Sequence, residues 1–124
     1  MTRDMELIRT LLLRIDTDPR LDGMSSLFVQ NTEELGITGH SMPEVAYHIR
    51  LLIEADFIKG NPNVAGGMPA IVRLTWNGHE FLDDVRDPDV WSKTKERVGT
   101  VGGVALAFVW EIAKAELKKK LHLQ

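Results

Sequence analysis

A stretch of apolar residues at helical spacing leads directly into a strand-like segment, and this junction most constrains the fold. The stretch VAYHIRLLIEADFI, from Val45 to Ile58, has apolar residues three and four positions apart before the strand-like residues begin. A gap rich in Gly, Pro and Asn follows, and RLTWNGHEFLD then starts as a strand and continues at helical spacing. The sequence therefore predicts a helix, two strands joined by a long loop, and a second helix.

The first of these helices has clear start and stop signals. Ser41 followed three residues later by Glu44 forms a capping box, and Pro43 fits the first turn because its missing N–H would be unpaired there. The helix is expected to end near Ala55. Asp56 then occupies the place where a left-handed residue ends a helix, a conformation that Asp tolerates.

The hairpin and the segments before it predict the fold. The strands are expected over residues 57–59 and 71–74, with residues 60–70 as the wing loop. Upstream, a helix is expected over residues 2–15 and a short strand over residues 27–29, while residues 32–35 fit one helical turn. Together these elements predict an α+β fold with a winged helix-turn-helix-like core and a small β-hairpin wing.

Extra helices are expected after the wing. Thr75 is a candidate cap for a helix from Trp76 to about Arg86, and Asp87-Pro88-Asp89 is typical of another helix start. Gly99 to Gly103 interrupts the pattern before a last helix over residues 104–121. The predicted division is a winged-helix-like domain over residues 1–98 and a C-terminal helix, for packing or dimerisation, within residues 99–124.

Two family resemblances accompany these patterns. The Val45 to Ile58 stretch resembles the third helix and first wing strand of arsenic-repressor-type winged-helix regulators. The matching residues are His48, Ile49, Arg50, Leu52, Ala55, Phe57 and Ile58, and Asp56 replaces a Gly. The wider pattern RDMELIR, ITGHS, EVAYHIRLLIEA and RLTWNGHEFLD, with a following Val-Trp, resembles a "domain of unknown function" family of small phage and bacterial proteins over residues 3–95. That resemblance implies a winged-helix-like fold and a prophage or bacterial origin, and it brings no known activity.

Composition narrows the classes of function. The net charge of −3 lacks the basic surplus of a dedicated nucleic-acid binder, so any basic surface must be local. There is no cysteine for thiolate catalysis or Cys-based zinc binding, and the charged start MTRDMELIRT differs from a secretion signal. The apolar segment over residues 101–113 contains Glu111 and is too short for a bilayer span. We therefore expect a cytoplasmic protein without a membrane segment.

The candidate nucleic-acid residues lie on the third helix and the wing. A helical wheel places Val45, Ile49, Leu52 and Ile53 toward the core, and Tyr47 and Leu51 on the opposite side. The residues that a duplex DNA would meet are Tyr47, His48, Arg50, Lys59 and Arg73. Two alternatives stay open, because Tyr47 and Leu51 could pack against protein, and Lys59 and Arg73 could guard strand edges from other chains.

Catalytic and metal chemistry find little support in the sequence. There is no GxSxG, no HExxH and no His and carboxylate set at nucleophile spacing. Glu44 with His48, and His79 with Glu80, lack the clear spacing of a zinc site. Trp76, Phe81 and Trp91 are expected in the core or in helix packing, so no enzyme, cofactor, metal or small-molecule ligand is inferred.

The last helix carries a wide apolar stripe. The residues of this stripe are Val104, Phe108, Ile112 and Ala115, and it is widened by Val101, Ala105, Val109 and Trp110. A stripe of this width calls for a partner, so it predicts a homodimer, and the alternative is that the helix caps its own core. The sequence thus favours a non-enzymatic regulatory module that binds double-stranded DNA. A protein-interaction module without nucleic-acid contacts is the competing hypothesis.

Overall fold

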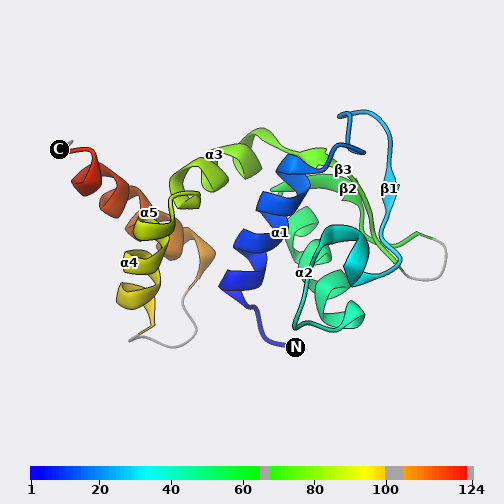
Figure 1. Cartoon of the computed structure of the whole chain (residues 1–124), viewed down its shortest axis with the longest axis horizontal. Helices are drawn as coiled ribbons and strands as arrows, with labels where there is room; N and C mark the ends of the chain where they lie inside the picture. Colours follow the sequence, from blue (N-terminus) through cyan, green and yellow to red (C-terminus); the bar gives the residue numbers. More distant parts are fainter. Residues whose placement is uncertain (65–67, 100–104, 123–124) are drawn as a thin grey trace. The chain divides into compact units, whose positions relative to one another are not determined.

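The computed structural model describes residues 1–64, 68–99 and 105–122. Over these residues the protein is α+β, as predicted, with five α-helices, one 3₁₀ helix and a three-stranded antiparallel sheet (Figure 1). The elements are α1 (Met5–Thr17), β1 (Leu27–Phe28), η1 (Thr32–Leu35), α2 (Met42–Glu54), β2 (Ile58–Asn61), β3 (Ala70–Leu74), α3 (Trp76–Val85), α4 (Pro88–Val98) and α5 (Leu106–Lys120).

The chain divides into two compact units, Met1–His79 and Glu80–Gln124. Their boundary lies within α3. The division predicted after residue 98 falls inside the second unit, because α4 packs against α5.

The N-terminal unit is built on a sheet of strand order β1-β3-β2. Helix α1 contacts α2 and β3, and α2 contacts β2. The apolar spacing in α1 explains this packing, because its buried residues recur on one side of the helix: Leu7, Ile8, Leu11, Leu12 and Ile15. Residues of α2 and the sheet complete the core: Val45, Ala46, Ile49, Leu52, Ile58, Ile71 and Leu74.

The helix signals in the sequence act as predicted at the start and end of α2. The Ser41 hydroxyl accepts a hydrogen bond from the Glu44 N–H at 3.3 Å, and Asp56 has a left-handed φ of 62°. The carboxylate of Glu44 contacts His40 Nδ1 at 2.6 Å, in place of the Ser41 N–H that a capping box predicts.

A network of backbone contacts joins the end of α2 to the start of α3. The Thr75 N–H donates to the Phe57 carbonyl at 3.0 Å, and the Thr75 hydroxyl donates to the Asp56 carbonyl. The same hydroxyl accepts from the Gly78 N–H at 3.0 Å, so Thr75 caps α3 as predicted. These bonds fix the position of Trp76, which lies between Thr75 and Gly78.

Polar contacts cap α4 and link it to α5 in the C-terminal unit. Asp87 caps α4 by accepting from the backbone N–H groups of Asp89 and Val90. Arg97 Nη1 lies 2.9 Å from Glu116 Oε1, and this hydrogen bond keeps the pKa of the Glu116 carboxyl below its ordinary value.

An aromatic contact joins two helices within the C-terminal unit. The rings of Phe81 and Trp110 meet edge to face with their centroids 5.5 Å apart. Trp110 Nε1 also donates to Asp84 Oδ2 at 2.7 Å, which satisfies its indole N–H. The contact therefore ties α5 to α3.

The apolar stripe predicted on the last helix is not one surface. Ile112 is buried and Ala115 is half-buried, whereas Phe108 is 52% exposed. The buried side of α5 consists of Val109, Ile112, Ala113 and Glu116, of which Val109 and Ile112 belong to the predicted stripe. Val104 lies outside the described residues. Ile112 therefore packs within the chain, and an interface between two copies through α5 stays a prediction.

Candidate nucleic-acid interface

Two cationic side chains lie opposite each other on the β2–β3 hairpin. Lys59 and Arg73 are register partners, and both are exposed. The neighbouring partners Ile58 and Leu74 are buried, so the pleat directs the two cations away from the core. Like charges directly opposite each other destabilise a strand pair. Lys59 and Arg73 therefore form a local basic pair, and their placement does not increase the stability of the hairpin.

Trp76 lies beside this pair, and the structure overturns the expectation that it packs in the core. Its side chain is 77% exposed, whereas Phe81 and Trp91 are buried as predicted. A helical wheel explains the difference, because Gly78, Phe81, Leu82 and Val85 form the buried side of α3 and Trp76 lies opposite them. The spacing of these residues in the sequence already places Trp76 on the outer side of α3. The prediction followed the general preference of aromatic residues for buried positions instead.

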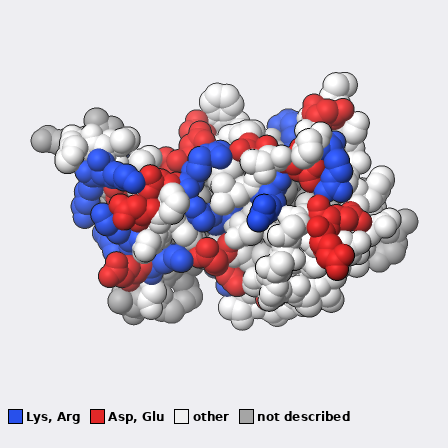
Figure 2. Space-filling view, in the orientation of Figure 1, with Lys and Arg blue, Asp and Glu red and all other residues white. Residues whose placement is uncertain are grey.

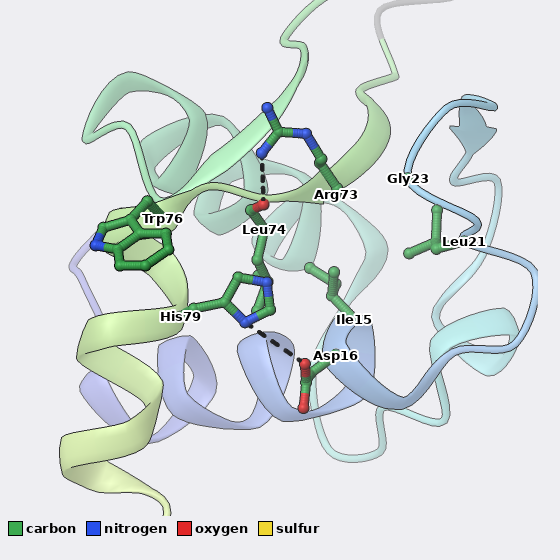
Figure 3. A pocket seen from close by; sticks show the side chains of 8 residues that line it. All are labelled: Ile15, Asp16, Leu21, Gly23, Arg73, Leu74, Trp76 and His79. Atoms are coloured by element: carbon green, nitrogen blue, oxygen red, sulfur yellow. Dashed lines mark hydrogen bonds and ion pairs between the residues drawn. The ribbon is translucent and has the colours of Figure 1, made fainter.

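Two shallow recesses adjoin Arg73 and Trp76, and both residues line both recesses. One recess, of about 380 Å³, is also lined by Ile15, Asp16, Leu21, Gly23, Leu74 and His79. Figure 3 shows Trp76 and His79 on one side of this recess and Leu21 and Gly23 on the other. His79 Nδ1 lies 3.8 Å from Asp16 Oδ1, a pair that is ionic when the imidazole is protonated.

The second recess lies on the hairpin side of Trp76. Its volume is about 450 Å³, and its further lining residues are Ile53, Asp56, Ile58, Lys59, Gly60 and Thr75. Arg73 Nη1 donates to the carbonyl of Leu74 at 3.0 Å, which orients the guanidinium beside both recesses. Sequence reasoning found Lys59 and Arg73, but it did not find these recesses or their carboxylates, Asp16 and Asp56.

The candidate residues on α2 are placed differently. Arg50 is half-buried, and its Nε donates to the carbonyl of Pro62 at 2.9 Å, so it is bound to the loop after β2. Tyr47 is half-buried, and its ring meets the ring of His48 edge to face at 5.6 Å. The α2 residues thus do not join Lys59 and Arg73 in one exposed cluster.

His48 is not a surface residue, which corrects its prediction as one of the residues that duplex DNA would meet. It is 0% exposed, and its Nε2 accepts a hydrogen bond from the Asp4 N–H at 2.8 Å. Nδ1 therefore carries the proton and donates to the Glu44 carbonyl at 2.8 Å. A groove of DNA cannot reach this imidazole, because the chain entering α1 covers it.

The charges of the N-terminal unit are mixed. Figure 2 shows Lys and Arg interspersed with Asp and Glu on the face in view, and the N-terminal unit has more carboxylates than cations. Phosphate contacts on this unit would consequently be few and local.

The remaining carboxylates offer no assembled metal site in the described part of the chain, where no group of three His, Cys, Asp or Glu is placed to hold an ion. Asp84 accepts from Trp110, and Lys120 Nζ lies 2.7 Å from Asp87. The bond from Lys120 keeps the pKa of the Asp87 carboxyl below its ordinary value. Among the same described residues, no helix has both the length and the apolar content needed to cross a membrane.

Comparison with known proteins agrees with the predicted family. The chain is 35% identical over 100 residues to an uncharacterised protein of Haemophilus influenzae, and the aligned region covers 79% of each chain. No solved structure matches the chain. The family model described as "Hypothetical protein (DUF2513)" matches residues 2–105, and the chain therefore belongs to this family.

Proposed function

We propose that the N-terminal unit is a winged-helix-like regulatory module of prophage or bacterial origin, which acts in the cytoplasm without catalysis and binds double-stranded DNA. The order helix, strand, 3₁₀ helix, helix and hairpin supports the winged-helix assignment. The observation that carries the DNA proposal is the exposed, directly opposed pair Lys59 and Arg73 on the hairpin. Cations in this position bind phosphate and set the orientation of a duplex without reading its sequence.

The hairpin is a better candidate for the DNA contact than α2. Around the outward residues Tyr47 and Leu51 lie Glu44 and Glu54, whose carboxylates repel phosphate. Arg50 contributes indirectly, since its bond to Pro62 holds the chain that leaves β2. DNA binding through the hairpin is therefore expected to be weakly sequence-dependent and strongly salt-dependent.

Replacing both Lys59 and Arg73 with Ala should weaken binding to every duplex alike. Each lost phosphate contact reduces the slope of log affinity against log salt by about 0.9, so the double variant should lose about 1.8. Fluorescence polarisation with a mixed-sequence duplex between 50 and 200 mM salt measures both effects. The charge-matched control is Lys93→Ala with Lys118→Ala in the C-terminal unit. Equal affinity and slope in both double variants would remove the hairpin from the interface.

A protein-interaction module is the second candidate, and exposed apolar residues favour it. Tyr47 and Leu51 are only half-buried on α2, and Phe108 is 52% exposed on α5. Large aromatic side chains are enriched where proteins meet. Within this candidate we propose that α5 pairs two copies of the chain through Phe108, since Ile112 is occupied inside the unit.

The homodimer predicts a concentration-dependent mass. Full-length protein should approach twice the chain mass by light scattering, and Phe108→Asp should weaken self-association at least tenfold, because a buried aromatic contact is replaced by an unpaired charge. Glu111→Gln on the same helix is the control, since the Glu111 side chain is 72% exposed. A monomeric full-length protein at high concentration would show that the homodimer proposal is wrong.

A further inference from the structure

Trp76 is an exposed aromatic side chain that the backbone holds in a defined place. The bonds from Thr75 to Phe57 and Asp56, and from Gly78 to Thr75, fix the chain on both sides of it. An isolated exposed apolar residue needs no explanation. Trp76 is not isolated, however, because both recesses adjoin it and both include Arg73.

The surroundings of Trp76 combine a flat apolar surface with cations. Lys59 lines the hairpin-side recess, and Arg73 lines both recesses. Aromatic faces beside Lys and Arg are what proteins use to hold a base and its adjoining phosphates. The same recesses contain the carboxylates Asp16 and Asp56, which can accept hydrogen bonds from the N–H groups of an unpaired base, including N3–H of thymine.

We propose that Trp76, Arg73 and Lys59 form a binding site for single-stranded nucleic acid. An unpaired base stacks on the Trp76 ring, and the phosphates on either side of that base bind Lys59 and Arg73. This inference rests on the nucleic-acid-binding part of the proposed function and goes beyond it, because it adds a single-stranded ligand to the duplex proposed above.

Only a single strand can use the Trp76 ring, whereas Lys59 and Arg73 can bind the phosphates of either ligand. Bases inside a duplex are stacked on one another and expose only their edges in the grooves, so a surface indole cannot reach their faces. A splayed base offers its face to any exposed ring, which makes such binding tolerant of sequence. One stacked base changes affinity by roughly 5- to 150-fold. The carboxylates in the recesses limit the attraction for phosphate, so removal of the ring should cost most of the affinity.

The test measures the binding of a labelled 12-nucleotide oligo(dT), and of a duplex of equal length, to the full-length protein by fluorescence polarisation. Trp76→Ala should weaken oligo(dT) binding at least tenfold, and Trp76→Phe should restore most of it, because a phenyl ring still stacks. Phe28→Ala is the matched control for loss of an exposed aromatic, because the Phe28 side chain is 54% exposed on β1 and lines neither recess. Binding should also quench tryptophan emission in the wild type and not in Trp76→Phe. Unchanged melting temperatures will show that the variants are folded, as expected at a position 77% exposed.

The outcomes separate this inference from the DNA proposal. Wild-type affinity of Trp76→Ala for oligo(dT) overturns the inference, and the DNA proposal survives if duplex binding still depends on Lys59 and Arg73. Oligo(dT) binding that depends on Trp76, without duplex binding, supports the inference and rejects the duplex proposal. If the protein binds neither probe, both proposals are wrong.

Discussion

Gly78→Ala is expected to destabilise the N-terminal unit by about 3 kcal/mol and to lower its melting temperature by roughly 12–24 °C. A Cβ at Gly78 would lie 2.1 Å from the carbonyl oxygen of Phe57, which is backbone and cannot rotate away. The added methyl group would push α3 away from Phe57 and break the hydrogen bond from the Gly78 N–H to the Thr75 hydroxyl. In a solvent-exposed part of a helix, Gly→Ala stabilises the fold by roughly 0.5–1 kcal/mol. The sign of the stability change therefore tests whether Gly78 lies against the Phe57 carbonyl.

Thermal denaturation followed by circular dichroism measures this effect. Asn77→Ala is the matched control, because Asn77 is exposed in the same turn and should change stability by at most about 0.5 kcal/mol. Gly60→Ala provides a second case, since its Cβ would lie 2.2 Å from the Ala70 carbonyl oxygen across the hairpin. A melting temperature of Gly78→Ala at or above that of the wild type would mean that α3 tolerates a shift from Phe57.

The features that the sequence predicted are those that neighbouring residues determine. The Ser41 cap, the left-handed Asp56 and the Thr75 cap each depend on residues within a few positions, apart from the long-range bonds of Thr75. Apolar spacing likewise predicted Val45, Ile49 and Leu52 on the buried side of α2, and the exposed residues Lys59 and Arg73 lie on the two predicted wing strands. Caps and helix ends can be predicted from one sequence because the two interacting residues lie within a few positions of each other.

The features that sequence reasoning missed depend on contacts between distant segments. The acceptor role of His48 is set by Asp4, which lies 44 positions away. The recess beside Trp76 brings together residues of α1, the loop after it, β3 and α3. On the wheel His48 lies near the edge of the outward side of α2, and the chain entering α1 converts that edge into an interior position.

The structure also explains why an apolar stripe did not predict a single surface on α5. The helical wheel of the last helix shows apolar residues that need a packing partner. It does not indicate whether that partner is a second chain or a neighbouring helix of the same chain. Packing against α4 and the Phe81 to Trp110 contact settled which side of α5 is used within the unit. Phe108 remains exposed because it lies off the side formed by Val109, Ile112 and Ala113.

Replacement of His48 should have the other large effect, because this one imidazole connects two helices. It accepts from the Asp4 N–H and donates to the Glu44 carbonyl, while Asp4 itself caps α1 through the Glu6 and Leu7 N–H groups. His48→Ala would leave a cavity and a buried N–H without an acceptor, which together cost about 3 kcal/mol. The entry to α1 should loosen with it, since the backbone of its cap residue loses its anchor.

Urea denaturation of the full-length protein measures this loss, and two further variants make it specific. His48→Gln retains an amide oxygen that can accept from Asp4 and should recover part of the stability. His40→Ala removes a half-buried imidazole that contacts only the Glu44 carboxylate among the bonds described, and it should change stability by about 1 kcal/mol or less. If His48→Ala were no more destabilised than His40→Ala, the imidazole would not anchor α1. Because His48 is buried, folded His48→Gln should bind duplex DNA as the wild type does, whereas a direct DNA contact would make its affinity fall with stability unchanged.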